Sequence, residues 1–183
     1  MGYKINNNSI EELAEKVVAL LKAGSLSVAF AESCTGGMVS AAVTGVPGSS
    51  EVLDLSIVTY ANAAKTAYTD VTENILSEHG AVSKETAALM ASGIRKRAGE
   101  VSGKNKENIV GVGITGIAGP TGAVPAKGNS PEKPVGTVYI AVDSDKTHVI
   151  KHFTFTGDRQ SVREETTRQA LEILHDYCIQ LTT

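Results

Sequence analysis

The sequence has no tryptophan, only 4% aromatic residues and only two cysteines among its 183 residues. With so few aromatic side chains, the core must be built from closely packed Ala, Val, Ile and Leu, which fits a hydrophobic content of 42% and the presence of 18 glycines. Cys34 and Cys178 lie far apart in the sequence. A disulfide scaffold would need more cysteines, so we expect a reducing compartment.

Basic residues are not in excess, because the formal net charge is -3. This disfavours a protein that wraps nucleic acid, although a small anionic substrate remains compatible with a few local donors. No apolar run is long enough to span a bilayer, no signal-like apolar core follows the early lysine, and Asn6 stands where the myristoylation pattern needs Ser or Thr. We therefore expect a cytoplasmic protein with neither a membrane nor a nucleic-acid partner.

The four histidines are scattered, and none pairs with another His or Cys at the spacing of metal ligands. The sequence therefore predicts no metal site and no other cofactor.

Hydrophobic spacing and turn residues predict helices that alternate with strands early in the chain, followed by a late β-hairpin. The first helix is signalled by a capping box, Ser9 with Glu12, and is ended by Gly24. The predicted helices cover residues 10–23, 36–43, 61–68, 71–78, 84–98 and 158–181, and the predicted strands cover 26–31, 53–60, 108–114, 136–142 and 148–155. This order predicts an α/β fold: one three-layer α/β/α domain over residues 1–183, with a mixed, partly parallel sheet.

The first candidate site is the segment AESCTGG at residues 31–37, between a predicted strand and a predicted helix. Backbone N–H groups are free at such a junction, and two glycines let a ligand approach closely, so Ser33 could attack a substrate beside an oxyanion site formed near Thr35, Gly36 and Gly37. Two alternatives stay open. Ser33 or Thr35 could simply cap the helix, and the adjacent Cys34 could be the nucleophile.

The second candidate is VTYANAAK at residues 58–65, in which Tyr60 ends a strand and Lys65 follows on a short helix. A lysine acts as a general base only if burial lowers its pKa toward neutrality, and the apolar run around Lys65 favours that over a surface position. Tyr60 could then relay the proton or orient the amine. Ser50, just upstream, could place a hydroxyl in the pocket or cap the segment at Glu51.

Two glycine-containing loops could complete a binding site. GITGIAGP at residues 113–120 follows a buried strand, so Thr115, Gly116, Ile117 and Gly119 could hold an oxyanion, a ribose or a phosphate, although a plain tight turn is an equal alternative. FTGDRQSVR at 155–163 opens the last helix with Arg159, which could bind a phosphate or make a surface ion pair.

Taken together, these segments resemble the C-terminal domain family of CinA, the competence/damage-inducible protein, which includes stand-alone nicotinamide-mononucleotide deamidases. Any single segment is weak evidence for the family. Their ordered combination is specific to it and covers nearly the whole chain after the first helix. The matching segments are AESCTGG (31–37), GSS (48–50), VTYANAAK (58–65), HGAVS (79–83), GITGIAGPTG (113–122), KPVGTVYIA (133–141) and FTGDRQSVR (155–163).

The resemblance implies hydrolysis of the carboxamide of nicotinamide mononucleotide to nicotinic acid mononucleotide and ammonia, by a Ser/Lys mechanism without a metal. It implies Ser33 as the nucleophile, Lys65 as the base, and Tyr60 and Ser50 as aids to proton transfer. It also implies an oxyanion or nucleotide site at Thr115 and Gly116, with Arg159 on the phosphate. The nucleophile could still be Ser50 rather than Ser33.

Further expectations concern the domain composition, the oligomeric state and one loop of this chain. The N-terminal domain of full-length CinA is missing from the sequence, so we expect the stand-alone form, and as a small α/β enzyme we expect a homo-oligomer. Residues 123–130 lengthen the loop before KPVGT and could act as a lid or alter substrate choice. The alternative function is a non-catalytic nucleotide-binding or regulatory module of the competence or DNA-damage response.

Overall fold

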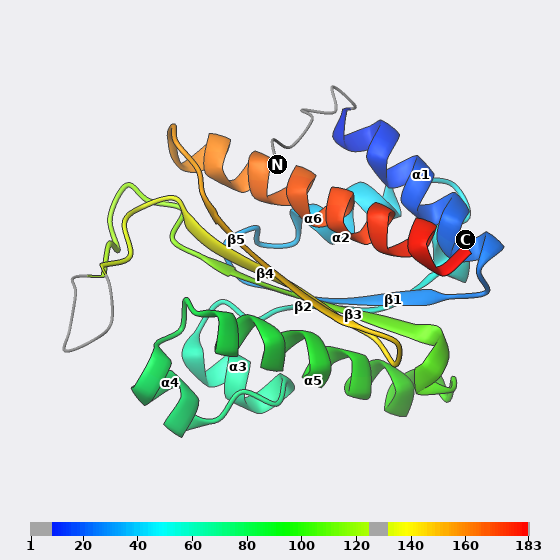
Figure 1. Cartoon of the computed structure of the whole chain (residues 1–183), viewed down its shortest axis with the longest axis horizontal. Coiled ribbons are helices and arrows are strands. Elements are labelled where there is room, and N and C mark those ends of the chain that lie inside the picture. Colours follow the sequence, from blue (N-terminus) through cyan, green and yellow to red (C-terminus); the bar gives the residue numbers. More distant parts are fainter. Residues whose placement is uncertain (1–8, 125–131, 183) are drawn as a thin grey trace.

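The computed structural model describes residues 9–124 and 132–182. Helices and strands alternate up to the third strand, after which the chain forms a β-hairpin and a long closing helix (Figure 1). The elements are α1 (Ile10–Ala23), β1 (Ser27–Glu32), α2 (Met38–Thr44), η1 (Ser49–Glu51), β2 (Leu53–Val58), α3 (Asn62–Tyr68), α4 (Glu73–His79), α5 (Lys84–Ser102), η2 (Lys106–Asn108), β3 (Ile109–Gly116), β4 (Thr137–Asp143), β5 (His148–Thr154) and α6 (Arg159–Thr182).

The five strands form one sheet in the order β2-β1-β3-β4-β5. The first three strands run parallel, and β4 and β5 are antiparallel to their neighbours, so the predicted mixed sheet is confirmed. In the register, Glu32 at the end of β1 lies between Val58 on β2 and Ile114 on β3. The carboxyl ends of the three parallel strands therefore meet at one edge, which is where α/β proteins place their ligands.

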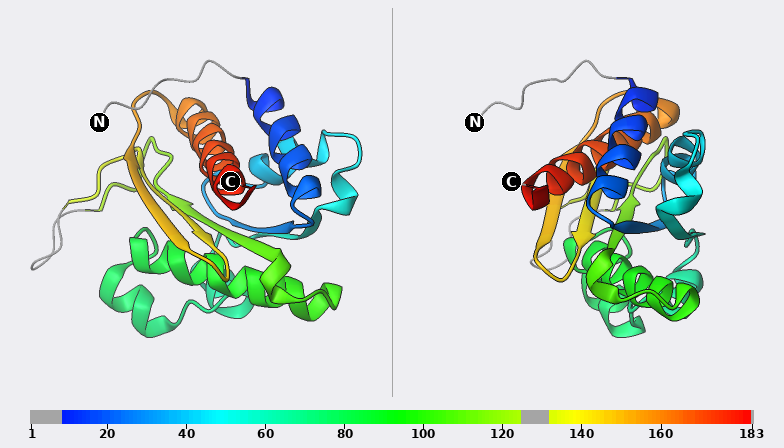
Figure 2. Two further views of the ribbon diagram at one scale, coloured as in Figure 1. Left: turned by 45° about the vertical axis from the view of Figure 1, so that its right-hand side comes forward. Right: turned by 90° about the vertical axis from the view of Figure 1, so that its right-hand side faces the viewer.

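Helices cover both faces of the sheet, which confirms the three-layer architecture. α1, α2 and α6 lie on one face, and α3, α4 and α5 lie on the other (Figures 1 and 2). The larger apolar cluster packs α1, α2 and α6 against the sheet, and a smaller one packs α5. Gly111 and Gly113 on β3 permit the close approach of α5, because a Cβ at these positions would lie 2.1 Å from Ala91 O and 2.3 Å from Ala87 O.

The predicted boundaries are accurate to a few residues, and the differences have local causes. The Ser9–Glu12 capping box is confirmed, since each side chain accepts a hydrogen bond from the other residue's backbone N–H. β2 ends at Val58 instead of Tyr60 because β1, its neighbour, leaves the sheet after Glu32. α5 continues past the predicted end at residue 98 and stops where Gly103 takes a left-handed conformation.

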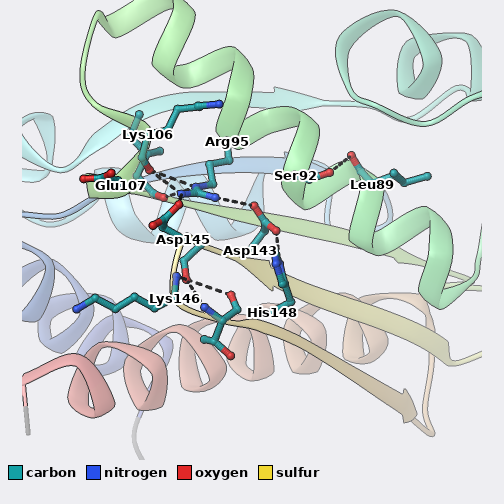
Figure 3. Close-up of polar contacts among 12 residues, drawn as sticks. Leu89, Ser92, Arg95, Lys106, Glu107, Asp143, Asp145, Lys146 and His148 are labelled. Carbon is teal, nitrogen blue, oxygen red and sulfur yellow. Dashed lines mark hydrogen bonds and ion pairs between the residues drawn. The ribbon is translucent and has the colours of Figure 1, made fainter.

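An ionic cluster fixes the β4–β5 hairpin at the sheet edge opposite the carboxyl ends of β1 and β3 (Figure 3). Arg95 on α5 donates to Asp143 Oδ2 at 3.3 Å and to the backbone carbonyls of Lys106 and Ile109 at 2.9 Å each, and His148 Nδ1 contacts the other oxygen of Asp143. The side chains of Arg95 and Asp143 are largely buried, so this cluster ties α5 to the hairpin.

Among the residues that the structure describes, no helix combines the length and the apolar character needed to cross a bilayer.

Candidate active site

The carboxyl edge of the parallel strands carries a cavity of about 210 Å³. Ser33 enters it directly after β1, Lys65 reaches it from α3, and Gly116 lies at the end of β3. The sheet register therefore brings together three segments that are far apart in the sequence. The lining residues are Ser33, Cys34, Tyr60, Asn62, Lys65, Ala81, Val82, Thr115, Gly116, Ala118 and Arg159.

Lys65 is buried beside Ser33, with only 2% of its surface exposed. Its Nζ lies 3.1 Å from Ser33 Oγ, 2.7 Å from the carbonyl oxygen of Thr59 and 3.3 Å from that of Tyr60. In the described part of the chain, no carboxylate forms an ion pair with this amine. Burial without a compensating anion lowers the pKa of Lys65 below 10.5.

The three partners of Lys65 can bond either an ammonium group, through its three N–H donors, or an uncharged amine. An uncharged amine has two N–H donors and one lone pair. The carbonyls of Thr59 and Tyr60 can only accept hydrogen bonds, so they take the two N–H groups. Lys65 Nζ is placed as a donor to Ser33 Oγ; once the amine is uncharged, the carbonyls retain the two N–H groups and the lone pair faces the Ser33 hydroxyl, the one partner with a proton to give. This arrangement suits a general base acting on a serine nucleophile.

Glu32 caps helix α2, so neither Ser33 nor Thr35 serves as its cap. The Glu32 side chain is fully buried, and its carboxylate accepts from the backbone N–H groups of Gly37, Val39 and Ser40 at 2.8–3.2 Å and from the Ser40 hydroxyl at 2.8 Å. A carboxylate here satisfies the orphan donors of the helix and interacts favourably with its dipole. The Ser33 hydroxyl is consequently not needed to cap α2.

This capping role corrects the expectation that Gly36 and Gly37 supply oxyanion donors. The Gly37 N–H is bonded to Glu32, and the Gly36 N–H donates to the carbonyl of Ser33 at 3.1 Å. Both glycines have positive φ angles, 62° and 97°, so their part is to turn the chain sharply between β1 and α2.

Replacing Glu32 with alanine is expected to destabilise the fold by about 3 kcal/mol, because several buried donors lose their acceptor together. Glu32→Gln should cost less, since its amide oxygen retains part of this acceptor capacity. Urea unfolding of both variants beside Glu51→Ala, an exposed carboxylate of η1, measures the effect. Equal stability of the Glu32→Ala and Glu51→Ala chains would contradict the capping role.

The neighbours of Ser33 contribute less than expected through their side chains. The Thr35 hydroxyl is buried, makes no hydrogen bond to described residues and does not line the cavity. Cys34 does line the cavity, but burial raises the pKa of its thiol to about 12. A thiol that stays protonated at neutral pH is a poor nucleophile, which favours Ser33 over Cys34.

Tyr60 and Arg159 form the rim of the cavity. The Tyr60 side chain is 60% exposed, and its hydroxyl accepts a hydrogen bond from Arg159 Nη2 at 2.8 Å. Only the backbone carbonyl of Tyr60 contacts Lys65, so the structure does not place its hydroxyl as a proton relay. Arg159 Nη1 also donates to the carbonyl of Gly119 at 2.7 Å, which holds the glycine loop beside the opening.

Of the remaining glycine-loop residues, some line the cavity and others only pair with the neighbouring strand. Gly116 and Thr115 line the cavity, although the Thr115 hydroxyl is already bonded to the carbonyl of Ala81 at 2.7 Å. Ile117 is buried outside the lining, and its N–H donates to the carbonyl of Thr137. We therefore find Gly116 at the cavity, while Ile117 continues the pairing of β3 with β4.

Ser50 is not part of this group, contrary to expectation. It is exposed in η1, before the first residue of β2, whereas Ser33 lies level with the last residue of β2. The length of β2, roughly 20 Å, separates the two serines. The structure thus removes Ser50 as the rival nucleophile and as an aid to proton transfer.

Three contributing residues escaped the sequence interpretation. Glu32 was hidden because a buried carboxylate inside a strand is uncommon, although Gly36-Gly37 downstream signalled a helix start. Arg163 donates to the carbonyls of Cys34 and Thr35, and its position one helical turn after Arg159 was the available signal. Asn62 lines the cavity from the first turn of α3, and nothing in the segment VTYANAAK distinguished it from its neighbours.

Most of the inserted loop cannot be compared with the site. Residues 125–131 lie outside the described residues, so the expectation of a lid is untested. The flanking residues Val124 and Lys133 pair as an isolated antiparallel bridge, and Lys133 Nζ donates to the carbonyl of His79 at 2.8 Å.

Within the described ranges, no three His, Cys, Asp or Glu side chains gather as a candidate metal site.

Comparison with known proteins identifies a family that matches nearly the whole chain. Residues 10–178 match the model of the CinA C-terminal domain. A CinA-like protein of Syntrophotalea carbinolica is 43% identical over 167 residues, covering 91% of this chain and 37% of the relative. A CinA-like protein of Anaeromyxobacter sp. (strain Fw109-5) is 46% identical over 173 residues, covering 94% of this chain and 39% of the relative. This chain thus spans about two-fifths of the length of the curated relatives it matches.

Solved structures agree with these sequence matches. The competence/damage inducible protein CihA of Agrobacterium tumefaciens superposes with a TM-score of 0.81 at 34% identity, covering 99% of this chain and 100% of that one. A CinA superfamily protein of Escherichia coli gives the same TM-score at 29% identity, with 95% and 94% of the two chains covered. From the family match over residues 10–178 and these likenesses, the chain belongs to the CinA C-terminal domain family.

Proposed function

We propose that this chain is a serine amidohydrolase that converts nicotinamide mononucleotide to nicotinic acid mononucleotide and ammonia. The observation that carries the proposal is the buried Lys65 amine, which lies 3.1 Å from Ser33 Oγ and has no anionic partner among the described residues. A lysine buried in this way costs stability, and such costs are typical of functional sites. The choice of nicotinamide mononucleotide follows from the family resemblance.

In the first half of the reaction, neutral Lys65 accepts the Ser33 proton while Ser33 Oγ attacks the carboxamide carbon. The resulting tetrahedral intermediate carries its negative charge on the former carbonyl oxygen. Lys65, now an ammonium group, returns the proton to the nitrogen, the carbon–nitrogen bond breaks, and ammonia leaves. The product of this half-reaction is an ester between Ser33 and the nicotinoyl group.

In the second half, water replaces ammonia in the same position. Lys65 removes a proton from the water, the resulting hydroxide adds to the ester carbon, and the proton then passes to Ser33 Oγ as the ester bond breaks. The carboxylic acid of nicotinic acid mononucleotide is released in its ionised form, and its proton goes to solvent. One amine thus acts as base and acid in turn.

Arg159 is the residue that we assign to the substrate phosphate. Its guanidinium lies at the rim of the cavity, exposed to solvent, and is held in place by the Tyr60 hydroxyl and the Gly119 carbonyl. A planar guanidinium can bind phosphate with two parallel hydrogen bonds. A phosphate at the rim would leave the nicotinamide ring free to enter between Ser33 and Gly116.

Incubation with nicotinamide mononucleotide, followed by mass spectrometry and an ammonia assay, tests the proposal. We expect a product about 1 Da heavier, because an amide becomes an acid, with one equivalent of ammonia. Nicotinamide and nicotinamide riboside serve as control substrates without the phosphate and should react more slowly. Tight binding of the mononucleotide with no turnover would instead support the non-catalytic nucleotide-binding module.

A further inference from the structure

The proposed reaction needs hydrogen-bond donors for the oxyanion, and the start of helix α2 cannot provide them. Its N–H groups at Gly37, Val39 and Ser40 are bonded to the Glu32 carboxylate, and that of Gly36 is bonded to Ser33 O. The donors must therefore come from other groups close to Ser33 Oγ. The backbone N–H groups of the two residues that follow Ser33, Cys34 and Thr35, interact with the Cys34 thiol, which is a weak acceptor.

Arg163 holds the two peptide groups that follow Cys34 and Thr35. From α6, its Nε donates to the carbonyl of Cys34 at 3.2 Å and its Nη2 to the carbonyl of Thr35 at 2.9 Å, while Nη1 donates to Gln160 Oε1 at 3.2 Å. Arg163 thus contacts the chain directly after the nucleophile, although it does not line the cavity. A residue with these contacts can act on the reaction only through the loop that it holds.

The direction of these bonds determines where the Thr35 N–H points. The peptide bond between Cys34 and Thr35 is trans, so its carbonyl and its N–H point in opposite directions. Because the Cys34 carbonyl points to Arg163 on α6, the Thr35 N–H points away from that helix. The Thr35 N–H and the Cys34 N–H both lie near the Cys34 thiol. Cys34 in turn lines the cavity.

We propose that the N–H groups of Cys34 and Thr35 form the oxyanion site and that Arg163 is its positioning residue. The inference rests on the proposed serine amidohydrolase function and adds to it the location of the oxyanion. Arg163 acts in two ways. It fixes the orientation of the Cys34–Thr35 peptide group, and its positive charge on the carbonyl polarises that group, which strengthens the N–H as a donor.

Substitution of Arg163 should lower kcat with little effect on KM, because the oxyanion forms only after the substrate has bound. For Arg163→Ala we expect a fall in kcat of about 100-fold, comparable to the loss of one oxyanion donor, with KM within about twofold. Added guanidinium ion should restore part of the lost kcat. Arg168→Ala is the matched control, since Arg168 lies on the same helix and pairs with Glu165, and it should keep wild-type kcat.

A fluorophosphonate probe separates this inference from the proposed function, because it reports the reactivity of Ser33 without the nucleotide. We expect labelling of the wild-type chain at Ser33 and slower labelling of Arg163→Ala. A wild-type chain that neither reacts with the probe nor releases ammonia overturns both proposals. An active wild-type chain beside an Arg163→Ala variant with unchanged kcat overturns the oxyanion site alone. Should the alanine variant be unfolded by circular dichroism, Arg163→Lys decides by the same criterion.

Discussion

Replacement of Ser33 with alanine is expected to reduce ammonia release from nicotinamide mononucleotide by about 10⁴- to 10⁶-fold, the range found when an activated nucleophile is removed. The effect should be this large because the other candidate nucleophiles among the described lining residues are unsuited: the Thr115 hydroxyl is bonded to the carbonyl of Ala81. The Cys34 thiol has a pKa raised to about 12 by burial, so it stays protonated. In the Ser33→Ala chain, water would have to attack the carboxamide directly, without a covalent intermediate.

Ser50→Ala is the matched control for this variant. Both substitutions remove one hydroxyl, but Ser50 is exposed at the amino end of β2, away from the cavity. We expect its kcat/KM to remain within about twofold of the wild-type value, as for a surface change away from the site. Steady-state ammonia release measures both variants. A fully active Ser33→Ala chain, or an inactive but folded Ser50→Ala chain, would contradict the assignment.

Replacement of Lys65 with methionine is expected to abolish turnover and to stabilise the fold. Methionine fills a similar volume without the desolvation penalty of the amine, so the free energy of unfolding at neutral pH should rise by about 1–2 kcal/mol, as is common when a functional polar group is removed. Turnover should fall at least about 10⁴-fold, because Ser33 loses its base. Opposite effects on activity and stability in a single variant distinguish a functional lysine from a structural one.

The stability gain should depend on pH in a defined direction. The pKa of Lys65 in the folded chain lies below the 10.5 of an unperturbed lysine. Between the two values the unfolded chain binds more protons, so the free energy of unfolding of the wild-type chain rises as pH increases through this window. The advantage of Lys65→Met should therefore be largest below the lowered pKa and should shrink toward pH 10.5.

Lys84→Met serves as the control for Lys65→Met. Lys84 opens helix α5 and its side chain is 69% exposed, so its amine pays no desolvation cost. Thermal unfolding of this variant should differ little from wild type, and its turnover should be unchanged. If Lys65→Met proved less stable than the wild-type chain across the whole pH range, Lys65 would be a structural residue held by its two carbonyl partners.

Much of the fold could be predicted from the sequence because its signals are local. The capping box, glycines at helix ends and runs of β-branched residues act over a few residues, and they placed each α-helix and strand of the described residues to within a few positions, whereas the short helices η1 and η2 were not predicted. The alternation of helices and strands then gave the layers. The end of β2 differs because the neighbouring strand leaves the sheet, which no local pattern reports.

The site was predictable in its central pair and less so around it. Lys65 stood out because its surroundings in the sequence are apolar, and Ser33 because it precedes two glycines. Glu32 and Arg163 were missed because their partners are backbone groups, which carry no side-chain signature. Ser50 was placed wrongly in the site because a motif gives the order of residues along the chain but not the end of the strand on which they lie.

The central claim is that an uncharged Lys65 amine activates Ser33, and an NMR titration of Lys65 tests it most directly. The side-chain carbon next to the amine should be followed with pH in the Ser33→Ala chain, and kcat/KM of the wild-type chain should be measured over the same range. We expect Lys65 to titrate below 10.5 and kcat/KM to rise as this amine loses its proton. Titration at 10.5 or above, or a rate that is flat through the transition, would contradict the central claim.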